Sequence, residues 1–322
     1  MSEATTSKAA GENEPFGTVA LIGIGLIGSS LSHAMRRGGL ARRITGHART
    51  TATRATALKL GLVDDVFESP GDAVRDADLV ILCVPVGAYA AVVREIAGDL
   101  KAGAILTDVG SVKGSVVRDV APHLPAGIHF VPGHPIAGTE NSGPESGFAE
   151  LFDNRWCILT PTKASAPEAV ERLAQFWRGL GSDVETMTPE HHDMVLAITS
   201  HLPHLIAFNI VNSARHLEEV TDREVIKFSA GGFRDVTRIA ASDPVMWRDV
   251  FLNNKEAVLE MLGRFSEDLT DLQRAIRFGD GDKLQHLFTE ARGVRKSIID
   301  IGQDTAAPDF GRHPKADGGK AE

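Results

Sequence analysis

The chain has 322 residues, a net charge of −9 at pH 7 and an isoelectric point near 5.7. With 43% apolar and 24% charged residues it has the composition of a folded protein of about two domains, which excludes wholesale disorder. The acidic charge argues against nucleic acid as the main partner, because binding to a phosphate backbone needs a basic surface. If the chain binds a small anion, we expect a few cations placed inside a cleft.

Cysteine content and hydropathy exclude two further classes. Cys83 and Cys157 are too few for a disulfide framework or a cysteine-based zinc site, and Cys83 stands in an apolar run at 79–84. No apolar stretch approaches the ~18 residues that span a bilayer, so we predict no membrane segment. Residues 1–15 are small and polar and lack the apolar core of a signal peptide, which predicts a disordered arm. We therefore expect a cytoplasmic protein.

Residues 16–188 alternate short apolar runs with helical stretches. The apolar runs predict strands at 18–22, 43–46, 79–84, 104–107 and 128–131, and the intervening stretches predict helices that include 26–35 and 51–60. Continuous apolar strands that alternate with helices are typical of a doubly wound α/β fold of the Rossmann type, with a mostly parallel sheet. We expect additional edge strands at 157–160 and 184–187, around a helix at 167–180.

The strand signals stop after Thr188, where a capping hydroxyl followed by proline predicts a helix start. We predict an all-helical substrate and dimerisation domain over 189–304 and a mobile tail over 305–322. Apolar residues recur there at intervals of three or four: Leu259, Leu262, Phe265, Leu269, Leu272 and Ile276. This stripe exceeds what one small helical domain needs to bury, which predicts a homodimer through the C-terminal half.

A glycine cluster follows the first predicted strand and matches the dinucleotide-binding fingerprint. Gly23 permits a tight turn, Gly25 allows a pyrophosphate to approach the backbone, and Gly28 lets the helix pack close to the strand. Leu26 and Ile27 open the helix, whose unpaired N–H groups would hold the phosphates. The alternative is a glycine-rich turn without a ligand. The place of the glycine cluster between a predicted strand and a predicted helix favours a bound cofactor.

The acidic residue that binds the ribose hydroxyls in NAD⁺-specific proteins is missing. The second strand ends in Gly46-His47-Ala48-Arg49, with Ala48 at the position of that residue. Its loss removes the repulsion against a 2′-phosphate, and Arg49 could pair with one. The alternative is that Arg49 stacks on adenine or points into water. The pattern favours NADP⁺ slightly over NAD⁺, or the use of both.

Two segments follow predicted strands, at the edge where open α/β sheets bind ligands. The first, at 107–114, presents Ser111, for which the alternative is an ordinary helix cap. The second, at 132–143, holds His134 stiffly between a glycine and a proline in a predicted loop. An imidazole with a pKa near neutrality suits proton transfer, although His134 could equally be a structural loop residue.

The predicted helix around 197–204 carries two polar groups on one face. Ser200 and His204 are four residues apart, and Pro203 predicts a kink because it cannot donate to the carbonyl group one turn earlier. A kinked helix suits a binding site better than a packing helix. Histidines lie two turns earlier, in 191–193, but the spacing and the lack of a third close carboxylate argue against a metal site.

The run Gly231-Gly232-Phe233-Arg234-Asp235-Val236-Thr237-Arg238 contains two arginines four residues apart. Asp235 can satisfy one of them, and the other can clamp a carboxylate bidentately. The alternative is a solvated cluster of surface ion pairs. This run supplies the placed cation that the acidic composition requires.

Assembled in order, these segments resemble the prephenate/arogenate (cyclohexadienyl) dehydrogenase family of tyrosine biosynthesis. The matching runs lie between residue 17 and about residue 250 and read GIGLIG, DVGSVKG, GHPIAGTENSG, SHLPH, GGFRDVTRIA and SDPVMWRD. The resemblance implies oxidative decarboxylation of prephenate to 4-hydroxyphenylpyruvate, with hydride transfer to NAD(P)⁺. It also implies arogenate as a second candidate substrate.

The resemblance further implies roles for individual residues. His134 would accept the proton of the ring hydroxyl, Ser111 would hydrogen-bond in the same region, and Arg238 would hold the ring carboxylate. The remaining substrate residues would be Ser200, His204, Thr139, Glu140 and Asp235. As a donor, His204 suits the pyruvyl group of prephenate better than the ammonium of arogenate. We expect the imidazole of His134 and the guanidinium of Arg238 to meet across a shared gap.

Two other functions remain open at this point. A β-hydroxy-acid dehydrogenase of similar architecture usually relies on a lysine base in its helical domain, where this chain has Ser200 and His204. A non-catalytic NADP-sensing protein would keep the glycine loop without needing histidine, serine and arginine together. We expect no regulatory domain after about residue 305 and no fused mutase before residue 16. Feedback by tyrosine would then act by competition at the active site.

Overall fold

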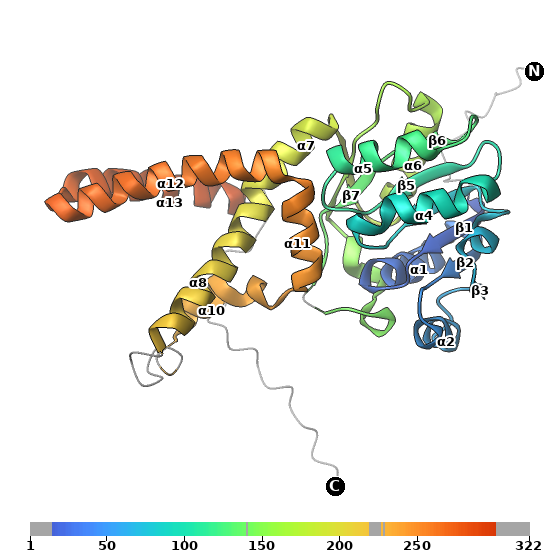
Figure 1. Ribbon diagram of the computed structural model, residues 1–322, viewed down its shortest axis with the longest axis horizontal. Coiled ribbons are helices and arrows are strands. Elements are labelled where there is room, and N and C mark those ends of the chain that lie inside the picture. The colour runs from blue at the N-terminus through green and yellow to red at the C-terminus, as the bar shows by residue number, and fades with distance from the viewer. Residues whose placement is uncertain (1–14, 140, 219–226, 228, 301–322) are drawn as a thin grey trace, which may run out of the picture. The chain divides into compact units, whose positions relative to one another are not determined.

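The computed structural model describes residues 15–139, 141–218, 227 and 229–300 (Figure 1). Glu140, most of the predicted N-terminal arm and the predicted tail lie outside the described residues. The chain divides into two compact units, Met1–His201 with Ser242–Ala257, and Leu202–Ala241 with Val258–Glu322. We expected a single boundary at Thr188. In this division the first unit extends to His201 and includes Ser242–Ala257, and the predicted domain limits stay a prediction.

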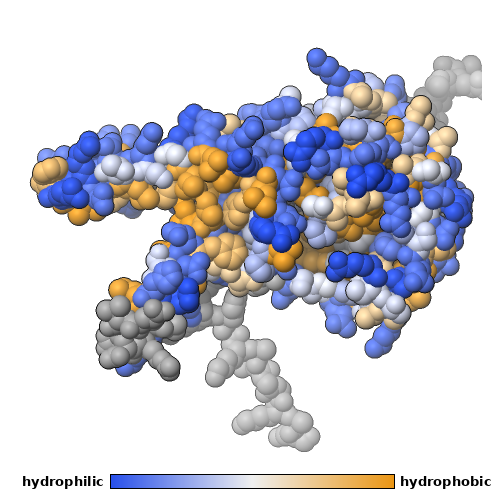
Figure 2. Space-filling model, viewed as in Figure 1, coloured by the Kyte–Doolittle hydropathy of each residue, from blue (hydrophilic) through white to orange (hydrophobic). Residues whose placement is uncertain are grey.

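Within its described residues the second unit is helical, as predicted. Its elements are α8 (Leu202–Glu218), α10 (Gly231–Thr237), a 3₁₀ turn (Arg238–Ala241), α12 (Lys255–Phe278) and α13 (Gly281–Asp300). Large apolar side chains on α12 and α13 are exposed in the single chain (Figure 2): Leu259, Leu269, Ile276, Phe278, Phe288 and Val294. Contiguous apolar surface of this kind is typical of an interface.

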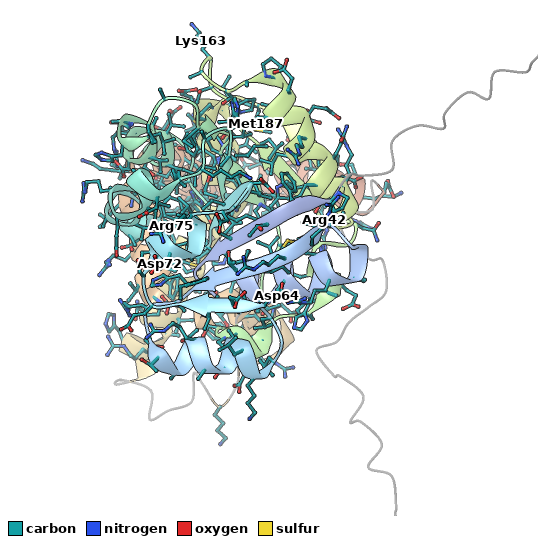
Figure 3. All side chains as sticks on the ribbon, turned by 90° about the vertical axis from the view of Figure 1, so that its right-hand side faces the viewer. Arg42, Asp64, Asp72, Arg75, Lys163 and Met187 are labelled. Atoms are coloured by element: carbon teal, nitrogen blue, oxygen red, sulfur yellow. The ribbon has the colours of Figure 1, made fainter. Side chains whose placement is uncertain are left out.

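The first unit contains a parallel sheet with the strand order β3-β2-β1-β4-β5-β6 among the described residues. The strands are β1 (Phe16–Ile22), β2 (Ala41–His47), β3 (Asp65–Phe67), β4 (Leu79–Leu82), β5 (Ile105–Asp108) and β6 (His129–Phe130). The predicted doubly wound sheet is confirmed. The edge strand β3, which follows the labelled Asp64 in Figure 3, escaped prediction because three residues carry too little pattern. The strand order reverses between β1 and β4, where doubly wound folds bind ligands.

Helices cover both faces of this sheet. They are α1 (Leu26–Gly38), α2 (Thr51–Lys59), α3 (Pro70–Val74), α4 (Tyr89–Ile96), α5 (Gly114–Val120) and α6 (Pro167–Gly179). Alternate strand residues belong to different cores: Val19 and Leu21 pack with α1 and α6, whereas Ala20 and Ile22 pack with α3, α4 and α5. The two-residue period of a strand thus explains why a central strand such as β4 is apolar throughout.

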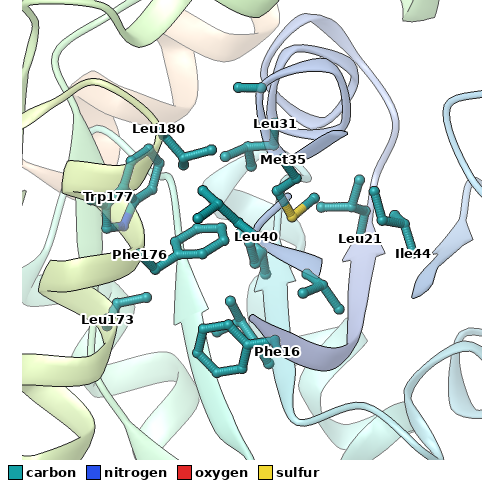
Figure 4. Packing of buried hydrophobic residues seen from close by; sticks show 14 of the residues in the cluster. Phe16, Leu21, Leu31, Met35, Leu40, Ile44, Leu173, Phe176, Trp177 and Leu180 are labelled. Atoms are coloured by element: carbon teal, nitrogen blue, oxygen red, sulfur yellow. The ribbon is translucent and has the colours of Figure 1, made fainter. Parts of the chain in front are cut away.

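Helix α6 packs on the same side as α1, although it lies far from α1 in the sequence (Figure 4). The Phe176 ring meets the Phe16 ring edge-on at 5.8 Å between centroids, and Trp177 is completely buried beside it. Edge-to-face aromatic pairs add to the stabilisation that burial provides. The aromatic pair ties the last helix of the α/β region to its first strand.

A second sheet in this unit corrects one prediction. The strands β7 (Gly133–Pro135), β8 (Trp156–Leu159) and β9 (Asp183–Thr186) pair in that order, with β7 antiparallel to β8. The segments expected to extend the large sheet as edge strands therefore form a sheet of their own. His134 lies in β7 opposite Ile158 rather than in a loop. The prediction failed because this strand is short and flanked by glycine and proline, which read as a turn.

The chain leaves the α/β region through α7 (Pro189–Leu196), which starts as predicted. The hydroxyl of Thr188 accepts a hydrogen bond from the N–H of His191 at 3.2 Å, and Pro189 is the first helical residue. A π-helical turn (Ala197–His201) then separates α7 from α8. This turn is the predicted irregularity, because Pro203 cannot donate the next helical hydrogen bond.

One hydropathy prediction needs correction. The helical run Pro189–Leu217 contains an 18-residue window with a mean hydropathy of 1.6, which satisfies the length and composition of a membrane span. We predicted no membrane segment because charged and polar residues interrupt this apolar run. His192 and His201 are fully buried within the first unit. Length and composition alone are weak evidence for a membrane span, because core helices of soluble proteins pass the same test.

Candidate active site

The glycine loop joins β1 to α1 as predicted and fits a dinucleotide. Gly23 has a φ of +102°, and a Cβ there would lie 2.7 Å from the carbonyl oxygen of Cys83. A Cβ on Gly28 would collide with the carbonyl oxygen of Gly23, whereas no described atom lies within 4 Å of a Cβ on Gly25. The open space at Gly25 faces the start of α1, whose N–H groups suit phosphate oxygens.

The end of β2 lies beside this loop. The N–H of Gly23 donates to the carbonyl oxygen of His47 at 2.9 Å. Ala48 is buried, with 5% of its surface exposed, and Arg49 is exposed. The position of the missing ribose-binding acid therefore holds a small buried side chain, with an exposed arginine next to it.

His134 is the first member of a buried hydrogen-bonded chain. Its Nδ1 lies 2.8 Å from Nε2 of His192, and Nδ1 of His192 lies 2.8 Å from a carboxylate oxygen of Asp193. A carboxylate only accepts, so Nδ1 of His192 carries a proton and its neutral Nε2 accepts from His134. We therefore assign the Nδ1–H tautomer to His134. The remaining nitrogen, Nε2, then has a lone pair that can accept a proton.

The electrostatics of the site agree with neutral imidazoles. Burial lowers the pKa of His134 well below its usual value, and the neighbouring His192 and the Lys113 ammonium lower it further. Burial also lowers the pKa of His192, against the opposing effect of Asp193. Desolvation disfavours the charged imidazolium, so both rings are neutral at pH 7. A neutral His134 is competent as a hydrogen-bond acceptor or a base.

Asp193 also fixes the loop that carries Ser111. Its two carboxylate oxygens accept from the backbone N–H groups of Lys113 at 2.7 Å and Gly114 at 2.8 Å. These groups precede and begin α5, just after the half-buried Ser111. One carboxylate thus orients the histidine chain and holds the segment of the predicted serine.

A buried ion pair ties the same loop to the strand of His134. The ammonium of Lys113 contacts the carboxylate of Asp108, and both side chains are fully buried. Lys113 also donates to the carbonyl oxygen of Gly133 at 2.7 Å, and Asp108 accepts from the N–H of Gly133 at 3.2 Å. Ser111 and His134 are therefore held on segments that are bonded to each other around Gly133.

Sequence reasoning missed these supporting residues. The sequence pattern indicates no role for Asp108 and Lys113, and it argues against a metal site at 191–193 without indicating another role for His192 and Asp193. Among the described residues, no group of three or more potential metal ligands occurs. The available signal was a pair of opposite charges five residues apart at the end of an apolar strand, since such charges avoid burial unless they are paired.

Three other predicted site residues belong to the first unit, and two of them are described by the structure. Ser200 lies half-buried in the π turn. Thr139 is exposed, and its hydroxyl accepts from the N–H of Asn141 at 3.2 Å. Glu140 lies outside the described residues. The predicted roles of these three residues remain predictions.

Three predicted substrate residues belong to the second unit. His204 is half-buried on α8, Asp235 is exposed on α10, and Arg238 is exposed at the start of the 3₁₀ turn. Their roles also remain predictions.

A cavity of about 330 Å³ lies between α7 and the β7–β9 sheet of the first unit. Its walls are apolar except for Glu185 and Thr199, and they include Ile136, Trp156 and the labelled Met187 of Figure 3. Ile136 directly follows β7 and is two residues from His134 in the chain. None of the predicted site residues lines this cavity.

Comparison with known protein families covers both parts of the chain. The model of the prephenate dehydrogenase nucleotide-binding domain matches residues 31–186, and that of the prephenate dehydrogenase dimerization domain matches residues 188–290. The first match ends at residue 186 and the second begins at residue 188. The matches together cover most of the chain.

Individual relatives agree with the family models. A cyclohexadienyl dehydrogenase from Zymomonas mobilis is 42% identical over 283 residues, which are 88% of this chain and 96% of the relative. A prephenate dehydrogenase from Bacillus subtilis is 35% identical, over 92% of this chain and 80% of the relative. The crystal structure of prephenate dehydrogenase from A. aeolicus with hydroxyphenyl propionate and NAD⁺ has a TM-score of 0.84 and 35% identity, covering 89% and 100% of the two chains. The chain belongs to the prephenate dehydrogenase family.

Proposed function

We propose that this chain oxidises and decarboxylates prephenate to 4-hydroxyphenylpyruvate, with hydride transfer to NAD(P)⁺. The observation that carries the proposal is the chain from Asp193 through His192 to His134, which leaves Nε2 of a buried, neutral imidazole as an acceptor. The family match and the glycine loop support the reaction class and the cofactor. When bound, NAD(P)⁺ supplies the hydride acceptor.

His134 acts on the hydroxyl group of the ring. Its Nε2 accepts a hydrogen bond from that hydroxyl and draws the proton toward it while hydride leaves the same carbon. Positive charge that builds up on the imidazole is stabilised by His192 and Asp193. Loss of CO₂ then gives electrons back to the ring, which becomes a phenol and keeps the proton on its oxygen. Atoms and charge therefore balance without net proton release.

The remaining residues bind and orient the substrate. Ser111 hydrogen-bonds beside His134, and Arg238 holds the ring carboxylate bidentately. The side-chain end is contacted by Ser200 and His204, and the pocket is completed by Thr139, Glu140 and Asp235. Aromatisation drives the loss of CO₂, so orientation of the ring is the main task of these residues. Since His204 suits a keto acid, prephenate is preferred to arogenate, which serves as a second substrate.

NADP⁺ is the preferred cofactor, with NAD⁺ as an alternative. The support is the pair of neighbours at the end of β2: Ala48 is buried and carries no carboxylate, and Arg49 is exposed. A 2′-phosphate would therefore meet an arginine and no acidic side chain at this position.

The chain also acts as a cytoplasmic homodimer in this proposal. The dimerization-domain match and the exposed apolar side chains of α12 and α13 support self-association. Dimerisation buries these side chains, which would otherwise reduce solubility. Cell fractionation that recovers the protein with membranes would contradict the cytoplasmic location.

Four assays test the activity directly. Purified protein is mixed with prephenate or arogenate and with NADP⁺ or NAD⁺, and the absorbance of reduced nicotinamide is followed. The expected rank is prephenate with NADP⁺ first. If neither substrate reduces either cofactor while 3-hydroxyisobutyrate does, the β-hydroxy-acid alternative replaces the proposal. A protein that binds NADP⁺ but reduces it with none of these substrates supports the sensing alternative.

A further inference from the structure

The side chain of Arg54 holds the turn between β2 and α2. It lies on the first turn of α2, and only 12% of its side chain is exposed. Its Nη1 donates to the carbonyl oxygens of Ala48 at 2.8 Å and Arg49 at 3.3 Å, and its Nη2 donates to the hydroxyl of Thr51 at 3.1 Å. One guanidinium thus binds three of the four residues at 48–51.

The turn is also fixed from its other side. The carbonyl oxygen of His47 accepts from the N–H of Gly23 in the glycine loop at 2.9 Å. The hydroxyl of Thr50 accepts from the N–H of Thr53 at 3.1 Å and caps α2. The turn that carries Arg49 is therefore anchored to the glycine loop, to α2 and to Arg54.

The direction in which the carbonyl groups of this turn point affects whether an anion such as a phosphate can bind there. A carbonyl oxygen carries partial negative charge and repels a phosphate, whereas the first N–H groups of a helix attract one. Arg54 binds the carbonyl oxygens of Ala48 and Arg49, which keeps them pointed at the guanidinium. Glu68 lies 3.8 Å from Arg54, but its side chain is 91% exposed, so water screens its charge.

We propose that Arg54 determines cofactor specificity as a positioning residue: it holds the turn at 48–51 so that Arg49 and the start of α2 receive the 2′-phosphate of NADP⁺. The inference rests on the NADP⁺ preference proposed above. Arg54 acts through the turn, because the hydrogen bonds described here direct its guanidinium at the turn itself. A lysine cannot replace it, since a single ammonium cannot reproduce the planar fork that reaches Ala48, Arg49 and Thr51 together.

The test uses two small probes that differ by one phosphate, 2′,5′-ADP and 5′-AMP, titrated calorimetrically into the full-length protein. The variants are Arg54→Lys, Arg49→Ala and the double variant, with Arg42→Lys as the matched control at an exposed arginine of β2. Arg54→Lys should lower the affinity for 2′,5′-ADP about tenfold, which corresponds to about 1.4 kcal/mol. The affinity for 5′-AMP should fall by less than about twofold. When Arg49 is already alanine, adding Arg54→Lys should lower the affinity for 2′,5′-ADP by less than about a further threefold.

Thr51→Val provides a second measurement that leaves Arg54 in place. It removes the hydroxyl that accepts a hydrogen bond from the guanidinium of Arg54. The affinity for 2′,5′-ADP should therefore fall about twofold to threefold. Unchanged 5′-AMP binding in each variant shows that the nucleotide domain is folded.

Each other outcome overturns a defined part of the inference. If the Arg54→Lys variant binds 2′,5′-ADP as tightly as the wild-type protein does, the role of Arg54 is overturned, even if the NADP⁺ preference holds. Additive losses from Arg49→Ala and Arg54→Lys mean that Arg54 contacts the phosphate itself, which overturns the positioning role. Wild-type protein that binds 2′,5′-ADP no better than 5′-AMP overturns the proposed cofactor preference and, with it, the role of Arg54.

Discussion

Nδ1 of His134 and Nε2 of His192 lie 2.8 Å apart, although 58 residues separate them in the chain. The first belongs to a short strand and the second to the helix that leaves the α/β region. The contact fixes the tautomer of His134 and the plane of its ring. It therefore determines which nitrogen of His134 is available for chemistry.

His134→Asn should lower kcat by at least about 100-fold and leave KM nearly unchanged. The amide removes the proton acceptor, whose effect is exerted mainly in the transition state. Steady-state kinetics with prephenate measure both constants, and unchanged binding of NADP⁺ serves as the folding control. Unaltered turnover would remove His134 from the catalytic role.

Asp193→Asn should reduce kcat about tenfold, because the amide no longer accepts as a charged group from His192 and stabilises an imidazolium less. It also weakens the bonds to the N–H groups of Lys113 and Gly114, so a loss of thermal stability should accompany it. The matched control is Asp235→Asn, an exposed carboxylate outside the histidine chain, which should not lower the melting temperature. A wild-type kcat for Asp193→Asn would show that the chain does not assist His134.

Stability should fall on the acidic side of about pH 6.5. Burial lowers the pKa of His134 and of His192 in the folded protein, whereas in the unfolded chain histidine titrates near 6.5. Below that pH the unfolded chain binds protons that the folded protein does not, so the free energy of unfolding decreases as pH falls. Above it, both rings are neutral in both states and contribute no slope.

Urea unfolding between about pH 5 and pH 8 measures this dependence. His192→Gln should make the dependence shallower, because it removes one of the two titrating groups from both states. A slope below pH 6.5 that is identical in wild type and variant would contradict a depressed pKa at His192.

Arg238→Gln should raise KM for prephenate about tenfold or more, since hydrogen bonds to charged groups contribute about 1.5–3 kcal/mol. Arg234→Gln, at the other exposed arginine of the same run, is the matched control and should change KM much less. Equal effects of the two variants, or an unchanged KM for Arg238→Gln, would place the carboxylate clamp elsewhere.

Lys113→Met should destabilise the protein by about 3–5 kcal/mol, because it leaves the carboxylate of Asp108 buried without its partner. Adding Asp108→Asn should recover part of that loss, since the second change removes the uncompensated charge. Urea denaturation of the two variants measures the recovery. If Lys113→Met were as stable as wild type, the pair would not be buried as described.

Light scattering should give twice the chain mass of 34.4 kDa. Phe278→Asp together with Val294→Asp should yield monomers, because both changes place a charge on exposed apolar positions of α12 and α13. A wild-type monomer would overturn the predicted homodimer.

The sequence predicted features whose determinants are contiguous. The glycine loop is specified by six neighbouring residues, and the strands of the parallel sheet by short apolar runs, so both are confirmed by the fold. The strand of His134 was missed because proline and glycine dominate its composition, although pairing with β8 stabilises it. Local propensity there is overridden by tertiary pairing.

The supporting chemistry of the site depends on contacts between distant segments and could not be read locally. His192 meets His134, and Asp193 meets the N–H of Lys113, only because α7 packs beside β7 and the start of α5. Arg54 likewise reads as an ordinary helical residue, since its bonds to Ala48 and Arg49 depend on side-chain direction. Sequence patterns specify which residues carry chemistry more readily than which residues orient them.

The single π turn at Ala197–His201 sets the rotational phase of the helix that follows it. In an uninterrupted α-helix, His192 and His201 are nine residues apart and would point about 180° away from each other. One extra residue in the turn cancels about 100° of that rotation and brings the two imidazoles toward the same side. There Asn254 donates to the carbonyl oxygen of Asp193 at 2.8 Å and lies 3.0 Å from Nδ1 of His201. Deleting Ile198 from this turn would therefore rotate the side chains of the helix that follows by about 100° about the helix axis.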